Sequence, residues 1–541
     1  LVARALTRAM MNRTGRILAA TAALAVAAGA ALPALAQKQG GILRLYHRDS
    51  PASMSIHEEA TWSAIMPMSA VFNNLVIYDQ HIKQNSLATI RPELAESWAW
   101  SEDGKDLIFK LRHGVKWHDG KPFTAVDVKC TWDLLLGQGK EKLRLNPRET
   151  WYLNLDKVSA NGDDEAVFHM KRPQPAFIAL LASGDSPVYP CHVSPRDMRT
   201  HPIGTGPFKF VDYKPNQSIK LTRNPDYWKP GLPHLDGIEY TIIPNRSTAV
   251  LSFVAGKFDM TFPWEVTFPL LKDIKSQAPQ AICDTEPLNV SATLAMVRKP
   301  PFDDLEIRRA LAMALDRQAF IDILSEGHDD ISAVMLPPPD GIWGIPIEQL
   351  RPFPGYGLDV AKSREEAREI MKRHGYGPDN PLRVKLSSRN IPAYRDPAAI
   401  LMDQLKSVFV EAELETIETA NWIPKLMRKD YTLAMSFSGS AVDDPDQIFY
   451  ESYICKSPRN YTGYCDHDME ALVDKQSIES DPEKRKQIVW EIERKMAADV
   501  VRPIIFHGRS TTCWYPYVKN ITQMSNSAYN GWRMEDVWLD K

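Results

Sequence analysis

Three aspartates in the run Asp443-Asp444-Pro445-Asp446 are the residues of this sequence best spaced to do chemistry. Carboxylates this close together could act as a general acid and base, hold a calcium ion, or anchor the charged amine of a ligand. The run lacks the D-x-D-x-D-G spacing of a calcium loop, and its composition is equally typical of an acidic surface turn. What these carboxylates do therefore depends on the elements that position them.

Sequence motifs of the common enzyme classes are absent. The chain contains no GxSxG, HExxH, P-loop or GxGxxG pattern. His57-Glu58-Glu59 opens like a zinc-protease helix, but no second histidine follows four residues after His57. There is no CxxC pair and no cluster of cysteine and histidine. We therefore predict no catalytic residues, no metal site and no cofactor.

A predicted strand over 431–437 leads into the aspartate run. Leu433, Met435 and Phe437 alternate with other residues, which is typical of a half-buried strand. Small residues follow at 438–441 and would let a ligand approach the backbone closely. The strand and this small-residue segment would thus place a ligand beside the aspartates.

Helices and strands alternate along the chain before this strand. Strands are predicted over 382–386 and 413–417, and helices over 397–410 and 421–428. This order is typical of a mostly parallel sheet with helices on its faces. Ligands of such sheets bind beyond the carboxyl ends of the strands. We therefore expect the segment after Phe437 to form one wall of a binding cleft.

Residues 1–36 have the features of a secretory signal peptide. Arginines precede an apolar run over 17–35, and Ala34-Leu35-Ala36 fits a cleavage site. Removing this segment takes away four arginines and no acid, so the formal charge changes from −3 to −7. A mildly acidic chain is unsuited to nucleic acid, and no further apolar run reaches the length of a membrane span. We therefore expect an exported, soluble protein.

Six cysteines lie in the exported part, where an oxidising environment favours disulfides. Cys455 and Cys465 close a short loop, and we predict that they are bonded to each other. The spacing of the other four fixes no pairing. These four are Cys130, Cys191, Cys283 and Cys513.

The exported chain also has two parts that differ in their predicted secondary structure. Residues 37–293 and the tail after 508 are rich in short strands, whereas 294–507 alternate between helices and strands. Asp304 and Asp316 are suited to begin helices in this second part. If the tail rejoins the first part, the chain crosses twice between two lobes, which would make a hinge.

Four blocks of sequence, read in order, resemble one known family. They are LAESWAWSEDGKDLIFKLRHGVKWHDGKPFTAVDVK, GTGPFKFVDYKPNQSIKLTRNPDYWK, PFDDLEIRRALAMALDRQAF and DDPDQIFYESYICKSPRNYTGYC. Together they resemble the bacterial extracellular solute-binding proteins of family 5, the peptide, nickel and opine class. These are periplasmic receptors of ABC importers, similar to dipeptide- and oligopeptide-binding proteins. The resemblance covers essentially all of residues 37–541.

The resemblance implies an α/β fold of the type II periplasmic-binding-protein kind. Two lobes joined by a hinge would enclose the ligand, and an extra domain would pack on lobe I. Lobe I would comprise 37–77, 203–293 and 508–541. The extra domain would be 78–202, and lobe II would be 294–507.

The resemblance also implies where the ligand would lie. Peptide receptors of the family carry an aspartate four positions before the cleft-loop proline, and here that position is Ala441. The lobe I contact loop matches Thr61-Trp62-Ser63, and Trp264 and Trp422 fall near cleft walls. Phe437 and Ser438 complete the expected site with Asp443 and Asp444. A tryptophan at 62 implies a ligand with a flat or apolar surface.

We therefore expect a periplasmic receptor that delivers a small organic solute to an ABC permease at the inner membrane, as a monomer and without catalysis. Because Ala441 cannot pair with an amine, a non-peptide solute is favoured. A peptide receptor that uses Asp443 or Asp444 as amine anchor is the alternative. A secreted hydrolase that uses the aspartate run is a remote one. If the register is right, Ala441→Asp should create or improve peptide binding.

Overall fold

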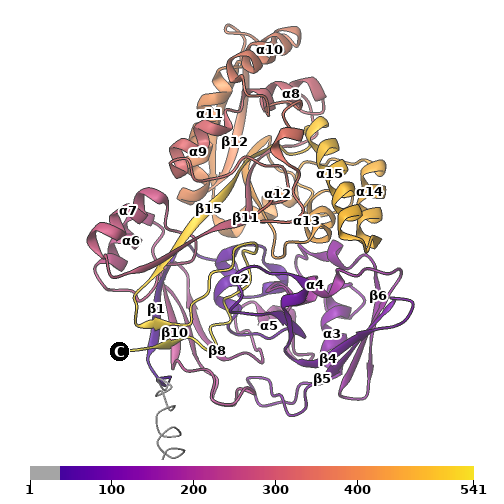
Figure 1. Ribbon diagram of the computed structural model, residues 1–541, viewed down its shortest axis with the longest axis vertical. Helices are drawn as coiled ribbons and strands as arrows, with labels where there is room; N and C mark the ends of the chain where they lie inside the picture. Colours follow the sequence, from indigo (N-terminus) through magenta and orange to yellow (C-terminus); the bar gives the residue numbers. More distant parts are fainter. Residues whose placement is uncertain (1–36) are drawn as a thin grey trace, which may run out of the picture.

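The computed structural model describes residues 37–541 (Figure 1). The predicted signal peptide, residues 1–36, lies outside the described residues. The described part forms three bodies, each with its own sheet and its own apolar core. None of the helices in this part is long and apolar enough to cross a membrane.

Lobe I, at the lower left of Figure 1, is built on a four-stranded sheet in the order β1-β10-β9-β8. β1 and β10 are parallel, and the other pairs are antiparallel. The chain leaves this lobe after α2 and returns before β8, so the body is assembled from distant segments. Its elements are β1 (Ile42–His47), η1 (Ile56–Glu58), α2 (Trp62–Met68), α5 (Pro195–Met198), β8 (Phe208–Lys214), β9 (Ser218–Arg223), β10 (Gly237–Ile242), α6 (Arg246–Val254), α7 (Phe268–Gln277), β16 (Val518–Lys519) and β17 (Trp538–Leu539).

The extra domain, at the lower right of Figure 1, is inserted between β1 and β8 of lobe I. Its antiparallel sheet has the order β4-β5-β7-β6 and packs against α3. Its elements are β2 (Val76–Tyr78), η2 (Leu87–Thr89), β3 (Ile90–Pro92), β4 (Ala95–Trp100), β5 (Asp106–Leu111), α3 (Ala125–Leu135), η3 (Glu149–Tyr152), β6 (Leu155–Asn161), β7 (Glu165–Met170) and α4 (Phe177–Ala182).

Lobe II, at the top of Figure 1, has a five-stranded sheet in the order β13-β12-β14-β11-β15. β12 is parallel to both β13 and β14, as the β-α-β order predicts, whereas β11 and β15 are antiparallel. Its elements are β11 (Ile282–Met296), α8 (Leu305–Ala314), α9 (Arg317–Ser325), η4 (Ile347–Gln349), α10 (Val360–Arg373), β12 (Leu382–Arg389), α11 (Pro392–Lys406), β13 (Val410–Ile417), α12 (Thr419–Met427), β14 (Leu433–Gly439), α13 (Pro445–Ser452), α14 (His467–Ile478), α15 (Pro482–Ala498) and β15 (Ile504–Trp514).

Aspartate caps fix where the helices of lobe II begin. The carboxylate of Asp304 accepts a hydrogen bond from the backbone N–H of Glu306 at the start of α8, and that of Asp316 accepts one from Ala319 in α9. Each cap satisfies a backbone donor that the first helical turn leaves unpaired. The two caps confirm the sequence-based expectation for Asp304 and Asp316.

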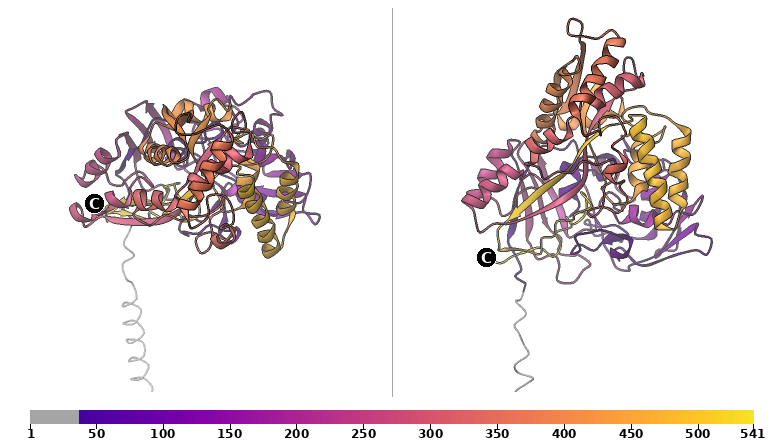
Figure 2. Two further views of the ribbon diagram at one scale, coloured as in Figure 1. Left: turned by 90° about the horizontal axis from the view of Figure 1, so that it is seen from above. Right: turned by 45° about the horizontal axis from the view of Figure 1, so that its top comes forward.

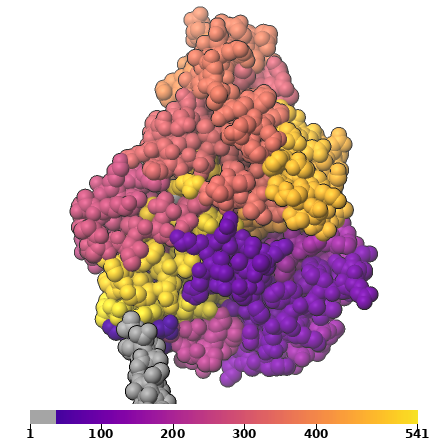
Figure 3. All heavy atoms as spheres, in the orientation of Figure 1, coloured from indigo at the N-terminus to yellow at the C-terminus, as the bar shows by residue number. Residues whose placement is uncertain are grey.

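Two long strands, β11 and β15, cross from lobe I into lobe II and pair with each other on both sides of an interruption between Pro287 and Ser291. The right-hand view of Figure 2 shows β15 as a long yellow arrow that rises between the bodies. These strands are the two crossings that the sequence predicts. In Figure 3 the salmon, orange and gold surface of lobe II lies directly above the violet surface of the extra domain.

Candidate functional site

A cavity lies between the lobes, at the carboxyl ends of β12 and β14 and beside the crossing strand β11. The cavity has a volume of about 140 Å³. Lobe I, β11 and the C-terminal tail supply Arg48, Ala60, Thr61, Trp62, Trp264, Glu265, Leu288, Val290, Ala528 and Tyr529. Lobe II supplies Arg389, Ala393, Tyr394, Trp422, Ile423, Leu426, Ser436, Phe437, Gly439, Arg459 and Tyr461.

Aromatic rings form both walls of this cavity. On the lobe I side, Trp62 and Trp264 are stacked, with ring centroids 4.4 Å apart and planes at 22°. On the lobe II side, the ring of Tyr394 lies edge-to-face with Phe437 at 4.7 Å and with Trp422 at 5.8 Å. Two facing aromatic walls suit a flat or apolar part of a ligand.

Trp264 has an uncommon backbone conformation, with φ +61°. The left-handed region costs energy for a residue with a large side chain, so the surrounding structure must hold it there. One such restraint is the hydrogen bond that its backbone N–H donates to Thr512 Oγ1 at 3.2 Å. The strained residue is also the one that stacks on Trp62, so the aromatic wall is fixed in advance of any ligand.

A buried ion pair joins the two lobes beside the cavity. Asp49, just after β1, faces Arg389 at the end of β12, and its carboxylate also accepts hydrogen bonds from Thr419 and Ser63. Arg389 donates in addition to Thr419 Oγ1 at 2.9 Å and to Ser63 Oγ at 3.0 Å. Burial raises the pKa of Asp49, but the charges of Arg389 and Arg48, together with His47 and the hydrogen bond from Ser63, outweigh burial and lower this pKa far below its ordinary value. Both partners are therefore charged at neutral pH.

Glu265 is the one carboxylate in the cavity lining of the described residues. Its Oε1 accepts from Arg48 Nη1 at 2.8 Å, and its Oε2 accepts from Arg246 Nε at 3.3 Å. Each carboxylate oxygen of Glu265 thus already accepts a hydrogen bond from an arginine. The carboxylate is neutralised by lobe I itself, so it offers little to a ligand cation.

Arg459 is a cavity arginine with unused hydrogen-bonding capacity. It forms an ion pair with the buried carboxylate of Glu451 through Nη1 and donates to Tyr461 Oη through Nε at 3.2 Å. Its Nη2 has no hydrogen-bond partner among residues 37–541. Glu451 in turn accepts from Trp151 Nε1 of the extra domain at 2.7 Å. The extra domain thus helps to position an arginine of the cavity wall.

Arg502 adds a second positive charge directly behind the lobe II wall. It is buried and donates to Thr293 Oγ1 at 2.9 Å, to Ser436 Oγ at 3.0 Å and to the carbonyl of Phe437 at 3.3 Å. No carboxylate pairs with it in the described part of the chain. Ser436 and Phe437 separate this charge from the cavity, so its field acts on whatever the cavity holds.

Three buried polar atoms of the wall lack hydrogen-bond partners within residues 37–541. They are the Nε of Arg48, the hydroxyl oxygen of Thr61 and the indole nitrogen of Trp62. A buried donor without a partner is costly, and a ligand acceptor is one way to satisfy it. Thr61 and Trp62 belong to the loop that the family resemblance implied as a contact loop.

Five of the residues proposed from the sequence line the cavity, namely Thr61, Trp62, Trp264, Trp422 and Phe437. The remaining candidates lie elsewhere. Ser63 is one layer behind, in the hydrogen-bond network of Asp49. Ser438 is buried on β14, where it pairs with Ser291 of β11. Contact of any of these residues with a ligand stays a prediction.

Ala441 lies outside the cavity lining, and its expected role needs correction. Its side chain is buried in the apolar core of the extra domain, together with Val442. Its carbonyl accepts from Ser527 Oγ at 2.6 Å and from Asn530 Nδ2 at 3.0 Å, which ties it to the C-terminal tail. The structure therefore gives no support for an amine-binding position at this residue.

The aspartate run is also turned away from the cavity. Asp444 caps α13 and receives both terminal nitrogens of Arg485 at 2.8 Å. Asp446 accepts from Gln174 and Ser477 and lies 3.2 Å from Arg485. The carboxylates of Asp444 and Asp446 are thus already paired with other side chains of the protein. This correction removes the geometric basis for an amine anchor and for an acid–base cluster at the run.

Asp443 is partly buried between lobe II and the tail, where Asn526 Nδ2 lies 3.4 Å from its Oδ2. Burial raises the pKa of Asp443 to about 7, and the neighbouring charge of Asp444 acts in the same direction. Because this pKa is higher in the folded than in the unfolded state, the free energy of unfolding is highest below the ordinary carboxyl pKa. It falls as the pH rises from there to about 7.

Asp443→Asn should therefore leave stability nearly unchanged at about pH 4 and raise it increasingly relative to wild type from there to pH 7, by roughly 1 kcal/mol or more above pH 7. Urea unfolding at about pH 4, 5.5, 7 and 8.5 measures this difference. Asp444→Asn is the matched control, because it breaks the pairing with Arg485 and should destabilise at every pH. Equal pH profiles for wild type and Asp443→Asn would contradict the assignment of a neutral Asp443.

Several cavity residues were missed by the sequence analysis. Arg389 ends β12, so the rule about carboxyl ends of strands could have found it had the strand been extended beyond 386. Tyr394 follows at the start of α11. Arg459, Tyr461 and Tyr529 carry no local signal, because loops from distant parts of the chain bring them to the site.

Three disulfides occur among the described residues. One confirms the predicted pair of Cys455 and Cys465. The other two resolve the pairing that spacing left open. They are Cys130–Cys191 within the extra domain and Cys283–Cys513 between β11 and β15.

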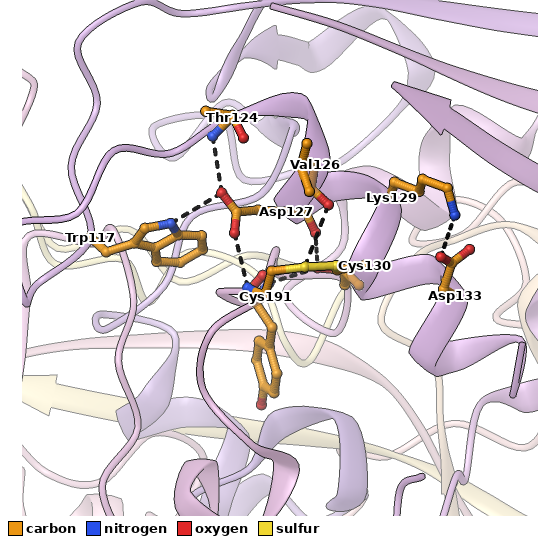
Figure 4. Close-up of a disulfide and its surroundings, with 10 residues drawn as sticks. Trp117, Thr124, Val126, Asp127, Lys129, Cys130, Asp133 and Cys191 are labelled. Atoms are coloured by element: carbon orange, nitrogen blue, oxygen red, sulfur yellow. Dashed lines mark hydrogen bonds and ion pairs between the residues drawn. A yellow bond between two sulfur atoms is a disulfide. The ribbon is translucent and has the colours of Figure 1, made fainter. Parts of the chain in front are cut away.

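Figure 4 shows how the Cys130–Cys191 bridge is embedded. Asp127, one turn earlier on α3, accepts from the backbone N–H of Cys191 at 2.9 Å and from that of Thr124 at 3.0 Å. The same carboxylate thus caps α3 and positions the second cysteine. This bridge lies far from the crossing strands in sequence, which makes it a useful control below.

Two hinged α/β lobes with a lined cavity at the ends of parallel strands define a receptor that encloses its ligand. The sequence model of the bacterial extracellular solute-binding proteins, family 5 middle, matches residues 89–460. The match spans more than half of the chain. The chain therefore belongs to this family of solute-binding proteins.

Curated relatives support this assignment. The di/tripeptide-binding protein 1 of Pseudomonas aeruginosa is 27% identical over 485 residues, which cover 83% of this chain and 85% of the relative. The dipeptide-binding protein of Escherichia coli is 26% identical over 443 residues, 77% of this chain and 81% of the relative. The relatives are thus matched over most of their length.

Solved structures agree in fold. The periplasmic binding protein DppA from Helicobacter pylori, in complex with the peptide STSA, has a TM-score of 0.80 at 20% identity and covers 93% of this chain and 99% of its own. The binding protein AgaA from A. tumefacien R10, in complex with agropinic acid, has a TM-score of 0.81 at 22% identity with the same coverage. At these identities the likeness shows the shared two-lobed fold.

Proposed function

We propose that this protein is a periplasmic, monomeric receptor that encloses a small organic solute with an anionic group and a flat or apolar body. It would deliver this solute to an ABC permease at the inner membrane and leave it chemically unchanged. The predicted signal peptide supports export, and the family and its named relatives support binding rather than turnover.

The excess of positive charge around the cavity is the observation that carries the proposal. Five arginines lie in the lining or are paired with it, against four carboxylates. The arginines are Arg48, Arg246, Arg389, Arg459 and Arg502, and the carboxylates are Asp49, Glu265, Glu451 and the half-exposed Asp396 beside Arg246. Charges removed from water are costly unless they are paired. A carboxylate or similar group on the solute would supply the missing partner.

The position of this partner follows from the donors that remain open. Arg459 offers Nη2, and a guanidinium favours planar carboxylate groups. Across the cavity, Thr61 and Trp62 offer a hydroxyl and an indole N–H. The stacked Trp62 and Trp264 face Tyr394 and Phe437 and would hold the apolar body. A solute that bridges Arg459 and Trp62 would thus contact both lobes and stabilise closure.

A dipeptide or tripeptide receptor is the second candidate, favoured by the names of the relatives. Such a ligand brings an ammonium group, which needs a carboxylate in the dry cavity. Glu265 is available for this role only in competition with Arg48 and Arg246. The geometry therefore favours an acidic non-peptide solute over a peptide.

We propose the division into lobe I (37–77, 203–293 and 508–541), extra domain (78–202) and lobe II (294–507) as the set of bodies that move in closure. The separate cores and the two crossing strands support this division. The boundaries at 293 and 507 fall within β11 and β15.

Titration calorimetry with four probes tests the proposed class of solute. The probes are agropinic acid, mannopinic acid, the dipeptide Met-Leu and the tetrapeptide STSA. We expect the two acids to bind at least tenfold more tightly than the two peptides, because each acid carries a net negative charge at neutral pH and the two peptides carry none. Tight binding of Met-Leu with no response to the acids would replace this proposal with the peptide receptor.

A further inference from the structure

The crossing strand β15 passes from one lobe to the other within a few residues. Arg509 is bound to lobe II, since its backbone N–H donates to Asp329 Oδ1 at 2.6 Å and its Nε pairs with Asp330 at 3.0 Å. Thr511 is already bound to lobe I through a β-bridge to Val266. The contacts of β15 therefore change from lobe II to lobe I between Arg509 and Thr511.

The partner strand β11 changes its anchorage at the same level. The carbonyl of Asn289 accepts from the backbone N–H of Ser440 at 2.8 Å, and Val290 pairs with Gly439, so this part belongs to lobe II. The pairing between β11 and β15 is interrupted between Pro287 and Ser291. Residues 288–290 on β11 and Gly508 on β15 thus form a pivot segment in which the pairing is interrupted, and the ladder resumes where Pro287 pairs with Arg509.

The pivot segment is also part of the ligand cavity. Leu288 and Val290 line it, and an added Cβ at Gly439 would lie 3.2 Å from Val290 Cγ2. A solute in the cavity therefore touches the residues about which the lobes would turn. This contact gives closure a direct link to occupancy.

The first part of β11, residues 282–287, is held from one side only. Within the described residues its sole β-sheet neighbour is β15, because β14 pairs with β11 only from Val290 onward. Lys83 of the extra domain adds ion pairs to Asp284 and Glu286, but it is half exposed, so these contribute little. An edge strand with so few anchors would fray unless something else secures it.

The Cys283–Cys513 disulfide joins β11 to β15 on the lobe I side of the pivot, within this weakly held ladder. We propose that this disulfide is a conformational clamp that confines bending to the pivot segment. With the clamp in place, β11 and β15 turn as one ribbon, and the solute acts where the ribbon bends. Without the disulfide, residues 282–287 of β11 would separate from β15. Binding of the solute would then be coupled less tightly to closure of the lobes.

Hydrogen–deuterium exchange, measured by mass spectrometry, tests the clamp on the full exported chain. The variant Cys283→Ala/Cys513→Ala should exchange its amides at 284–286 at least tenfold faster than wild type. The pivot amides of wild type should already exchange faster than those at 284–286. A second pair, Cys283→Val/Cys513→Val, retains side chains suited to strands and guards against poor folding. Cys130→Ala/Cys191→Ala is the matched control, and it should leave exchange at 284–286 unchanged.

Spin labels on the exposed positions Val211 of lobe I and Leu358 of lobe II provide the readout for motion between lobes. Their distance distribution should broaden when the clamp is removed and stay unchanged in the control. Unchanged exchange at 284–286 together with an unchanged distribution would overturn the proposal. The inference rests on the proposed closure of two lobes, but both readouts need no ligand. Its failure is therefore distinguishable from a failure of the proposed solute class, which calorimetry reports.

Discussion

Asp49→Asn is expected to weaken binding of the best acidic probe about a hundredfold. The substitution keeps the shape of the side chain but leaves Arg389 charged and without a carboxylate in the closed state. Removing one partner of a buried ion pair costs about 3 kcal/mol, and this cost falls on closure because the two residues belong to different lobes. Calorimetry gives the affinity, and small-angle scattering with the probe present should show a more open average form.

The control for this prediction is Asp396→Asn. Asp396 also faces lobe I, where Arg246 lies 3.9 Å away, but its side chain is more than half exposed. An exposed pair contributes about 0–1 kcal/mol, so affinity should change by less than about fivefold. Equal effects of the two substitutions would contradict the interlobe role of the buried pair.

The same ion pair has a definite pH dependence. The pKa of Asp49 is lowered in the closed form, so its contribution is present at all pH values above the ordinary carboxyl range. It is lost only as the pH falls below that range and the carboxylate begins to bind a proton. Binding should therefore be insensitive to this group between pH 6 and 8.

Ala441→Asp is expected to destabilise the protein by at least about 3 kcal/mol and to create no peptide site. The side chain at 441 is fully buried among apolar residues of the extra domain, so a carboxylate there would have no partner. This outcome replaces the expectation from sequence, which placed the residue in the cleft. Urea unfolding measures the loss, and calorimetry with Met-Leu tests for peptide binding.

Ala399→Asp serves as the comparison for this substitution. It introduces the same charge on an exposed position of α11 in lobe II, where the carboxylate stays in water. Its effect should stay within about 1 kcal/mol. A folded Ala441→Asp protein that binds Met-Leu tightly would show that residue 441 reaches the ligand after all.

The fold was largely predictable because its signals are local. Alternation marked the strand at 433–437, and aspartate caps marked the starts of α8 and α9. The order of strands and helices then predicted a sheet in which β12, β13 and β14 are parallel. The antiparallel addition of β11 and β15 followed from long-range pairing, which local patterns do not encode.

The site was predictable only where family motifs or strand ends pointed to it. Trp62 and Trp264 came from the resemblance, and Phe437 came from the end of a strand. The contact of Ala441 with a ligand stays a prediction that the structure does not support, because β14 ends at Gly439 and Ala441 and Val442 pack in the core of the extra domain. The arginines at 389, 459 and 502 were missed because their charges acquire meaning only after folding brings them together.

A crystal structure with the best-binding probe of the panel tests the central claim most directly. The account predicts that the anionic group of the probe lies within hydrogen-bond distance of Arg459 and that its body lies between Trp62 and Tyr394, with both lobes closed. A probe bound on the outer surface, or one whose cationic group meets Asp443 or Asp444, would contradict it.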